Sequence, residues 1–246
     1  MGKKYFTLSF DDGLEQDKRV IRLMRQYGLK GTFNLNAGLF GTRGEVKGLG
    51  TFSFQDCPEG VKHKWPFSYV QHNRIPLDEV CQVYEGMEIA THGFRHEPLG
   101  VVSEDEMRAS VDADKAALEK IFGTTVVGHA YAQGSTSPAV QAYLKAQGYQ
   151  YARVVFPSGG FAFPENPMNF RPSSSLILKN AMKLVERFKC EEPGEKDLLL
   201  FLWAHSYEMD YEKGNASWYA LERLFESIAG RSDIVYCTNS EAFAHI

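Results

Sequence analysis

Three short groups of residues in this 246-residue chain can do acid–base or metal chemistry, and each directly follows a segment with the pattern of a buried strand. They are Asp11-Asp12-Gly13, His92-Gly93-Phe94-Arg95-His96, and His205 at the end of Leu198–Ala204. Carboxylates and imidazoles are common ligands of divalent transition metals. Because barrel strands present functional groups at their carboxyl ends, we expect the three groups to form one site.

Each group taken alone also has a plainer interpretation. Asp11 and Asp12 repel one another, and a bound metal would relieve that repulsion, although adjacent Asp and Gly also fit an ordinary turn. The i, i+4 spacing of His92 and His96 would place both imidazoles on one face if the segment between them formed a helical turn. Surface or capping histidines are the alternative. His205 alone would equally fit a hydrogen-bonded core histidine.

The motifs taken in order resemble those of the polysaccharide deacetylase family, also called the NodB-homology family or carbohydrate esterase family 4 (CE4). The matching segments are Ser9-Phe10-Asp11-Asp12-Gly13, His92-x-x-x-His96 preceded by Glu88-Ile-Ala-Thr, and Leu202-x-x-His205. The resemblance spans roughly residues 4 to 240. It implies a distorted (β/α) barrel and the hydrolysis of acetyl groups on sugars with the help of a divalent metal.

The resemblance also implies a role for five residues. Asp12, His92 and His96 would bind the metal, Asp11 would act as general base, and His205 would act as general acid. We expect zinc, while cobalt, nickel, iron and manganese also suit a mixed nitrogen and oxygen site with open positions. A bound ion lowers the pKa of water from ~15.7 toward ~7 and so makes a nucleophile available at neutral pH.

The third family motif, normally Arg-x-Pro-Tyr, is replaced by His129-Ala130-Tyr131-Ala132-Gln133-Gly134. Its arginine should hold the base, so another arginine is needed. Arg153, at the end of the next predicted strand, is the candidate catalytic residue, and Arg171 is a second possibility. We expect Tyr131 or Gln133 to line the substrate site in place of the tyrosine of the motif.

A second departure lies in the histidine motif. Gly93 stands where the family usually has Ser or Thr, whose hydroxyl braces the loop. Another group must therefore brace the loop in this chain.

Strand-like and helical segments alternate along the chain, which predicts an α/β fold with about seven parallel strands. We expect one domain over residues 1–246, arranged as a distorted (β/α) barrel. Strands are predicted at 5–10, 32–36, 88–91, 126–132, 149–156, 198–204 and 234–237. Helices are predicted around 20–27, from 103 to 123, from 137 to 147, and at 176–188 and 217–228.

One stretch, about residues 38–76, breaks this alternation. It is rich in glycine and has no helical period, which predicts a long loop insertion containing a hairpin. Aromatic residues alternate within it at Trp65, Phe67 and Tyr69. Trp65 is a candidate for substrate contact, since its ring could stack on a sugar, but these rings could equally pin the loop to the barrel.

Charge and composition exclude several other functions. The chain has 27 basic and 31 acidic residues, a formal charge of -4 and no basic run, which argues against nucleic acid and anionic membranes as partners. Its longest apolar run has seven residues, against the roughly 20 needed to span a bilayer. The charged start is followed by an apolar stretch that Asp11 interrupts, which predicts no export signal and a cytoplasmic location. None of the four cysteines forms a Cys-x-x-Cys pair.

We therefore expect a metal-dependent carbohydrate deacetylase acting on an acetylated carbohydrate, with an N-acetyl group as the expected target. The altered third motif keeps open a hydrolase of a cyclic amide or ureide on the same fold. A non-catalytic carbohydrate-binding relative is the other alternative. Ring-opening relatives usually alter the metal ligands, and a binding protein would be expected to lose the base or the acid. All five residues are present here, which favours the metal enzyme.

Overall fold

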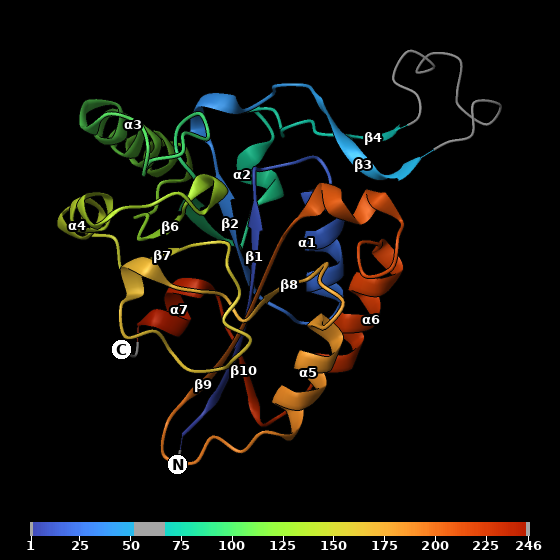
Figure 1. Ribbon diagram of the computed structural model, residues 1–246. Coiled ribbons are helices and arrows are strands. Elements are labelled where there is room, and N and C mark those ends of the chain that lie inside the picture. Colours follow the sequence, from blue (N-terminus) through green and yellow to red (C-terminus); the bar gives the residue numbers. More distant parts are fainter. Residues whose placement is uncertain (1, 52–66, 245–246) are drawn as a thin grey trace.

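The computed structural model describes residues 2–51 and 67–244 (Figure 1). Its main sheet has eight strands, all parallel. Seven follow the order β7-β6-β5-β2-β1-β9-β8, and β10 pairs with the first part of β1 while β2 pairs with its second part. They are β1 Lys4–Asp11, β2 Gly31–Leu35, β5 Glu88–Thr91, β6 Gly128–Ala130, β7 Tyr151–Arg153, β8 Ser174–Ser175, β9 Leu198–His205 and β10 Ile234–Tyr236. The prediction of a distorted α/β barrel with about seven parallel strands is confirmed.

The sheet curls but does not close by strand pairing between β7 and β8. One extended segment, residues 170–173, bridges that opening. Phe170 N donates to Ala152 O on the β7 side, and Ser173 N donates to Phe201 O on the β9 side. The barrel is thus completed by irregular backbone, which explains its distortion.

Helices lie along the outside of the sheet, with α1, α5 and α6 on one side and α3 and α4 on the other (Figure 1). They are α1 Asp17–Gln26, α2 Val80–Val83, α3 Glu104–Phe122, α4 Pro138–Ala146, α5 Ala181–Cys190, α6 Trp218–Ile228 and α7 Asn239–Phe243. The predicted capping box of α3 is present between Ser103 and Glu106, and Gly123 ends this helix in the left-handed conformation.

The apolar strands β1 and β9 run side by side over their whole length and form the centre of the core. Phe10 on β1 stacks on Phe33 of β2 at 5.6 Å between ring centroids, and Leu202 of β9 is fully buried. Burying an aromatic or leucine side chain contributes roughly 1.5–3 kcal/mol. This packing holds the strand ends rigidly in register.

Three predicted elements have wrong boundaries, and one strand of the main sheet was not predicted. The helix expected over 176–188 begins only at Ala181, because Leu176 continues the pairing of β8 by donating to Trp203 O. The two-residue strand β8 was missed since it consists of serines and is too short to show any pattern. The strands expected at 126–132 and 149–156 shrink to the three-residue β6 and β7.

The excursion over residues 38–76 contains an antiparallel pair, β3 Glu45–Thr51 and β4 Phe67–Gln71, as the predicted hairpin requires. After β4 the chain returns to the barrel, where Glu15 N donates to Asn73 O and Ile75 N donates to Gly13 O. Trp65 lies outside the described residues, so its contact with substrate stays a prediction. Among residues 2–51 and 67–244, no helix has the length and apolarity to cross a membrane.

Candidate active site

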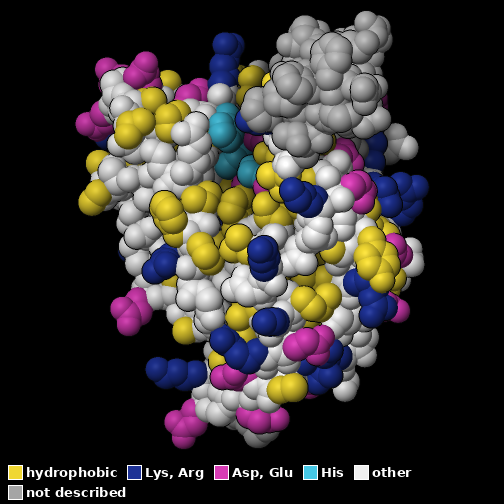
Figure 2. All heavy atoms as spheres, turned by 45° about the vertical axis from the view of Figure 1, so that its right-hand side comes forward, with side chains coloured by type: hydrophobic (Ala, Val, Ile, Leu, Met, Phe, Trp, Pro, Cys, Tyr) yellow, Lys and Arg dark blue, Asp and Glu magenta, His cyan; other side chains and the backbone are white. Residues whose placement is uncertain are grey.

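The register of the sheet brings the predicted residues together. Asp11, the last residue of β1, pairs with Asn34 on β2 and with His205 on β9. Thr91 pairs with Leu35 at the end of β2, and His92 follows it immediately. The carboxyl ends of neighbouring parallel strands therefore present these side chains on one edge, where histidine side chains are visible in a hollow (Figure 2).

Asp12, His92 and His96 form a compact cluster. Asp12 Oδ1 lies 3.8 Å from His92 Nε2 and 3.7 Å from His96 Nε2, and the three ligand atoms are all within 4.8 Å of one another. A tetrahedral ion with bonds of about 2.1 Å separates its ligand atoms by roughly 3.4 Å. These three side chains therefore fit one divalent ion with only small movements.

The protonation of this cluster also suits a metal. His92 Nδ1 donates to Ala130 O at 2.7 Å, which leaves the lone pair on Nε2, a buried atom without a hydrogen-bond partner in the described structure. Such a second bond commonly fixes the tautomer of a metal-binding histidine. Burial and the neighbouring His92 lower the pKa of His96 to about 4, so it is neutral at pH 7. Burial would raise the pKa of Asp12, but a hydrogen bond from His72 and nearby histidines lower it below its ordinary value.

The two histidines are not placed by a helical turn, the geometry in which their i, i+4 spacing would have put both rings on one face. Gly93 and His96 both have left-handed backbones, with φ of 80° and 63°, and His96 N donates to Gly93 O at 3.2 Å. This tight turn still brings the rings of His92 and His96 to 4.8 Å between centroids. Asp12 is also left-handed, with φ of 81°. Strained backbones of this kind concentrate at functional sites.

Asn36 and Asp114 brace the histidine loop in place of the hydroxyl that Gly93 lacks. Asn36 Nδ2 donates to the carbonyls of His92 and Gly93 at 2.8 and 2.7 Å. The Asp114 carboxylate accepts from His92 N at 3.0 Å and from Ala37 N at 2.8 Å. Asp114 lies on α3, where nothing in the sequence distinguishes it from the exposed acidic residues around it.

Asp11 lies beside the cluster and is held by Arg153. Its Oδ1 accepts a hydrogen bond from Arg153 Nη2 and another from Asn34 Nδ2 at 2.7 Å. Burial would raise the pKa of Asp11, but Arg153, His92 and His205 together lower it below its ordinary value. The carboxylate therefore stays ionised, as a general base must be.

Arg153 reaches this carboxylate from β7, where it is in register with Ala130 of the third motif. Its guanidinium is buried and stacks on Trp203 at 4.6 Å from the ring. Arg171, the second candidate from the sequence, instead donates to the carbonyl of Pro157. The geometry thus selects Arg153 as the partner of Asp11.

His205 forms a charged pair with Glu208, a residue that the sequence interpretation missed. Its Nδ1 lies 3.6 Å from Glu208 Oε2, which also accepts from His205 N at 2.8 Å, and its Nε2 lies 3.9 Å from Asp12 Oδ2. Burial lowers the pKa of His205, but Glu208, Asp12 and Asp11 outweigh this and raise it to about 9. The imidazole is therefore cationic at pH 7. The sequence signal that could have identified Glu208 is its position three residues after His205.

The two third-motif residues proposed for substrate contact behave differently. Tyr131 is fully buried and its hydroxyl donates to Met168 O at 2.8 Å, so this side chain belongs to the core rather than to the site. The expectation that it lines the cleft is not supported, because the ring fills the space between β6 and residues 167–169. Gln133 is exposed in a short 3-10 turn with a left-handed backbone, and its substrate contact stays a prediction.

Two further side chains reach Asp12 from the segment that follows β4. His72 Nε2 lies 3.0 Å from Asp12 Oδ2, and Arg74 Nη2 lies 3.3 Å from Asp12 Oδ1. An isolated bridge between Leu14 and Arg74 fixes this segment beside the loop after β1. About 60 residues separate these side chains from Asp12 in sequence, and no motif connects them.

Asp17 binds the backbone of the loop that follows Asp11 and Asp12. Its Oδ2 accepts from Leu14 N at 3.0 Å and from the hydroxyl of Tyr84 at 2.7 Å, and the side chain is fully buried. Burial raises the pKa of Asp17 to about 7. A carboxyl group in this position keeps its proton in the folded protein under conditions in which the unfolded chain has lost it.

We expect Asp17 to make wild-type stability fall as pH rises from about 4 to about 7. Over this range the Asp17 carboxyl ionises in the unfolded state but stays protonated in the folded state. The free energy of unfolding therefore falls by up to about 1.4 kcal/mol per pH unit. The Asp17→Asn variant has no carboxyl proton to lose at this position. Over the same pH range the free energy of unfolding of wild type should therefore fall by a few kcal/mol relative to that of Asp17→Asn, and the difference should then stay constant. Urea unfolding at several pH values measures this, with the exposed Asp105→Asn as control. Parallel curves for wild type and Asp17→Asn would reject the explanation.

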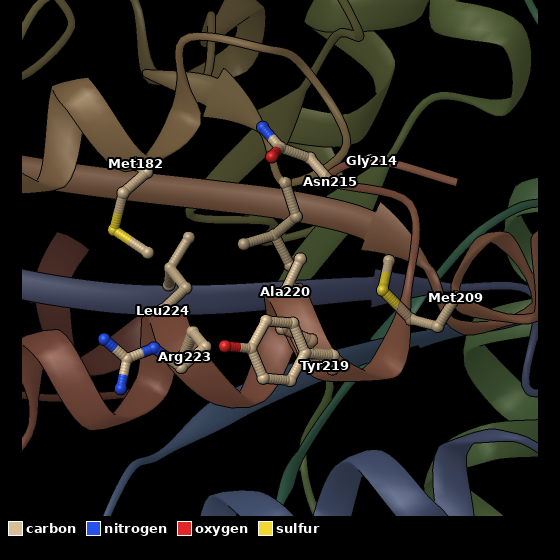
Figure 3. A pocket seen from close by; sticks show the side chains of 10 residues that line it. Met182, Met209, Gly214, Asn215, Tyr219, Ala220, Arg223 and Leu224 are labelled. Carbon is tan, nitrogen blue, oxygen red and sulfur yellow. The ribbon is translucent and has the colours of Figure 1, made fainter. Parts of the chain in front are cut away.

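A separate apolar pocket of about 370 Å³ lies beside α5 and α6 (Figure 3). Its lining includes Met182, Met209, Tyr219 and Leu224. None of the carboxylates or histidines of the candidate site contributes to it. The pocket therefore has no part in the chemistry of the Asp12, His92 and His96 cluster.

The family model for polysaccharide deacetylases matches residues 1–152 of this chain. The chain belongs to the polysaccharide deacetylase family. The matched residues include Asp11, Asp12, His92 and His96, whereas Arg153 and His205 lie beyond them. No curated protein matches the sequence.

Solved structures share the fold of this family member at low sequence identity. The Xyl-CE4 domain of a multidomain xylanase from the hindgut metagenome of Trinervitermes trinervoides has a TM-score of 0.54 and 16% identity, covering 100% of this chain and 91% of that one. The Puue allantoinase has a TM-score of 0.60 and 13% identity, covering 99% and 89%. A CE4 family pseudoenzyme from Bacillus anthracis has a TM-score of 0.57 and 15% identity, covering 98% and 66%.

Proposed function

We propose that this protein is a metal-dependent hydrolase that removes acetyl groups, chiefly N-acetyl groups, from a carbohydrate. The observation that carries the proposal is the meeting of Asp12, His92 and His96 beside an ionised Asp11 and a cationic His205. Membership of the polysaccharide deacetylase family supports the same substrate class. Zinc is the proposed ion, because two imidazoles and one carboxylate leave positions open.

Bound in this cluster, a divalent ion would supply Lewis acidity for both the attacking water and the acetyl carbonyl. Asp11 accepts the proton of the water, and Arg153 keeps this carboxylate ionised and oriented. His205 donates a proton to the leaving nitrogen, which is a poor leaving group without it. Glu208 keeps His205 in its cationic form until that step.

The allantoinase and the pseudoenzyme among the structural neighbours show that this fold accommodates other outcomes. Our proposal favours deacetylation over ring opening because the three metal-binding side chains are kept in one cluster. It favours catalysis over simple binding because the base and the acid both flank that cluster.

Metal removal tests this function directly. We expect the chelated protein to release acetate from penta-N-acetylchitopentaose only at background, and one equivalent of zinc to restore the rate by at least about a thousandfold. Acetate is measured by a coupled assay, with an O-acetylated xylo-oligosaccharide and allantoin run in parallel. Hydrolysis of allantoin by the metal-free protein would overturn the proposal in favour of a ring-opening amidase.

A further inference from the structure

Asp12 has a cationic neighbour that a metal site does not ordinarily need. Arg74 Nη2 lies 3.3 Å from Asp12 Oδ1, the same oxygen that faces His92 Nε2 and His96 Nε2. An ion held by these three residues and the guanidinium of Arg74 would therefore share one carboxylate oxygen. Two cations in contact with one oxygen repel each other, so ion binding would weaken the ion pair between Asp12 and Arg74.

The backbone prevents Arg74 from moving far from the site. Its N donates to Thr42 O at 2.9 Å, its neighbour Ile75 donates to Gly13 O at 2.9 Å, and a bridge pairs it with Leu14. The side chain is only 11% exposed, and its Nε is buried with no hydrogen-bond partner among the described residues. The guanidinium thus stays at the site, where Nη2 donates to Asp12.

The charges at the site do not balance once an ion is present. Asp11 and Asp12 supply two negative charges, and Arg74 and Arg153 supply two positive ones. These four charges cancel, so a divalent ion would add positive charge that they do not offset. Uncompensated charge in a buried site is costly, and a neutral acetamide does not offset it.

We propose that Arg74 is a specificity-determining residue that binds a negatively charged group, a carboxylate or a phosphate, close to the acetyl group of the sugar. This rests on the proposed function, since it names the substrate class of the same site. A guanidinium presents donors in a planar fork that matches both anions in bidentate geometry. The preferred substrate is accordingly an acidic acetylated sugar, which should bind more tightly than a neutral one.

Three probes that share the same 2-acetamido group test this assignment. They are N-acetylglucosamine, N-acetylmuramic acid with its lactyl carboxylate, and N-acetylglucosamine 1-phosphate. We expect zinc-loaded wild type to bind at least one acidic probe about tenfold or more tightly than the neutral one, by calorimetry. Arg74→Gln should abolish that preference without changing the affinity for the neutral probe, and Arg74→Lys should restore part of it. The preferred acidic probe distinguishes a carboxylate from a phosphate.

A second readout needs no sugar. Because Arg74 competes with the ion for Asp12, Arg74→Gln should bind zinc about tenfold more tightly than wild type in a chelator competition. Arg95→Gln, which removes the same charge from an exposed position on the histidine loop, should leave zinc affinity unchanged. Equal zinc affinity in wild type and Arg74→Gln would contradict the competition.

The two proposals fail in different ways. Equal binding of acidic and neutral probes, or a preference that survives in Arg74→Gln, would overturn the role of Arg74 even if acetate is released. Release of acetate from none of the acetylated substrates would overturn the deacetylase, while the binding and zinc measurements would still decide the role of Arg74.

Discussion

Replacing Asp12 with asparagine is expected to abolish metal binding and deacetylation together. The carboxylate is buried beside His92 and His96, and its charge is the main electrostatic attraction for a divalent ion in this cluster. Asparagine keeps the size but presents a neutral oxygen, which is a far weaker ligand. We expect at least about a thousandfold loss of activity, the scale on which metal activation of water acts.

Metal content by mass spectrometry, measured beside acetate release, checks this expectation. Wild type should hold about one equivalent of zinc or a neighbouring transition metal after loading. Asp105→Asn, the same change at an exposed position on α3, should retain both metal and activity. One equivalent of metal in Asp12→Asn, or activity without it, would disprove the assignment of this ligand.

Asp11→Asn should give the opposite combination, with metal retained and turnover lost. Asp11 Oδ2 lies 3.9 Å from His92 Nε2, and its Oδ1 accepts from Arg153, so this carboxylate borders the cluster and can accept a proton there. An amide cannot accept the proton from the attacking water. General-base catalysis contributes about 10²–10⁴-fold, so kcat should fall within that range.

The measurement is kcat on the zinc-loaded variant, together with its zinc affinity and thermal unfolding. Asp11→Asn leaves the buried guanidinium of Arg153 without its anion, which costs stability, so a folded and zinc-loaded sample is the necessary control. Wild-type kcat in such a sample would contradict the assignment of Asp11 as general base.

The strand-end residues could be predicted because parallel pairing makes their positions a consequence of topology. Once Asp11, His92 and His205 are placed at the ends of neighbouring strands, register alone brings them together. Arg153 could be predicted from a chemical need, because the base requires a cation and the usual arginine is missing. The first inference used only local sequence, whereas the second also used the resemblance to the family.

The residues that were missed depend on contacts between distant segments. His72 and Arg74 reach Asp12 through the path of the excursion, which no local pattern specifies. Asp114 braces His92 from a helix whose other acidic residues are mostly exposed. Tyr131 was misplaced because its motif position says nothing about which way the ring turns into the core.

Asp12 and His96 have left-handed backbones, which lower the stability of the fold but place their side chains in the candidate site. This conformation costs an L-residue roughly 1 kcal/mol or more that glycine does not incur, while glycine offers no ligand atom. A lineage under selection for robustness alone would drift toward glycine at both positions and keep its barrel. Loss of the proposed metal ligands would therefore be an easy evolutionary path away from activity on this scaffold, and the presence of Asp12 and His96 is what our proposed function requires.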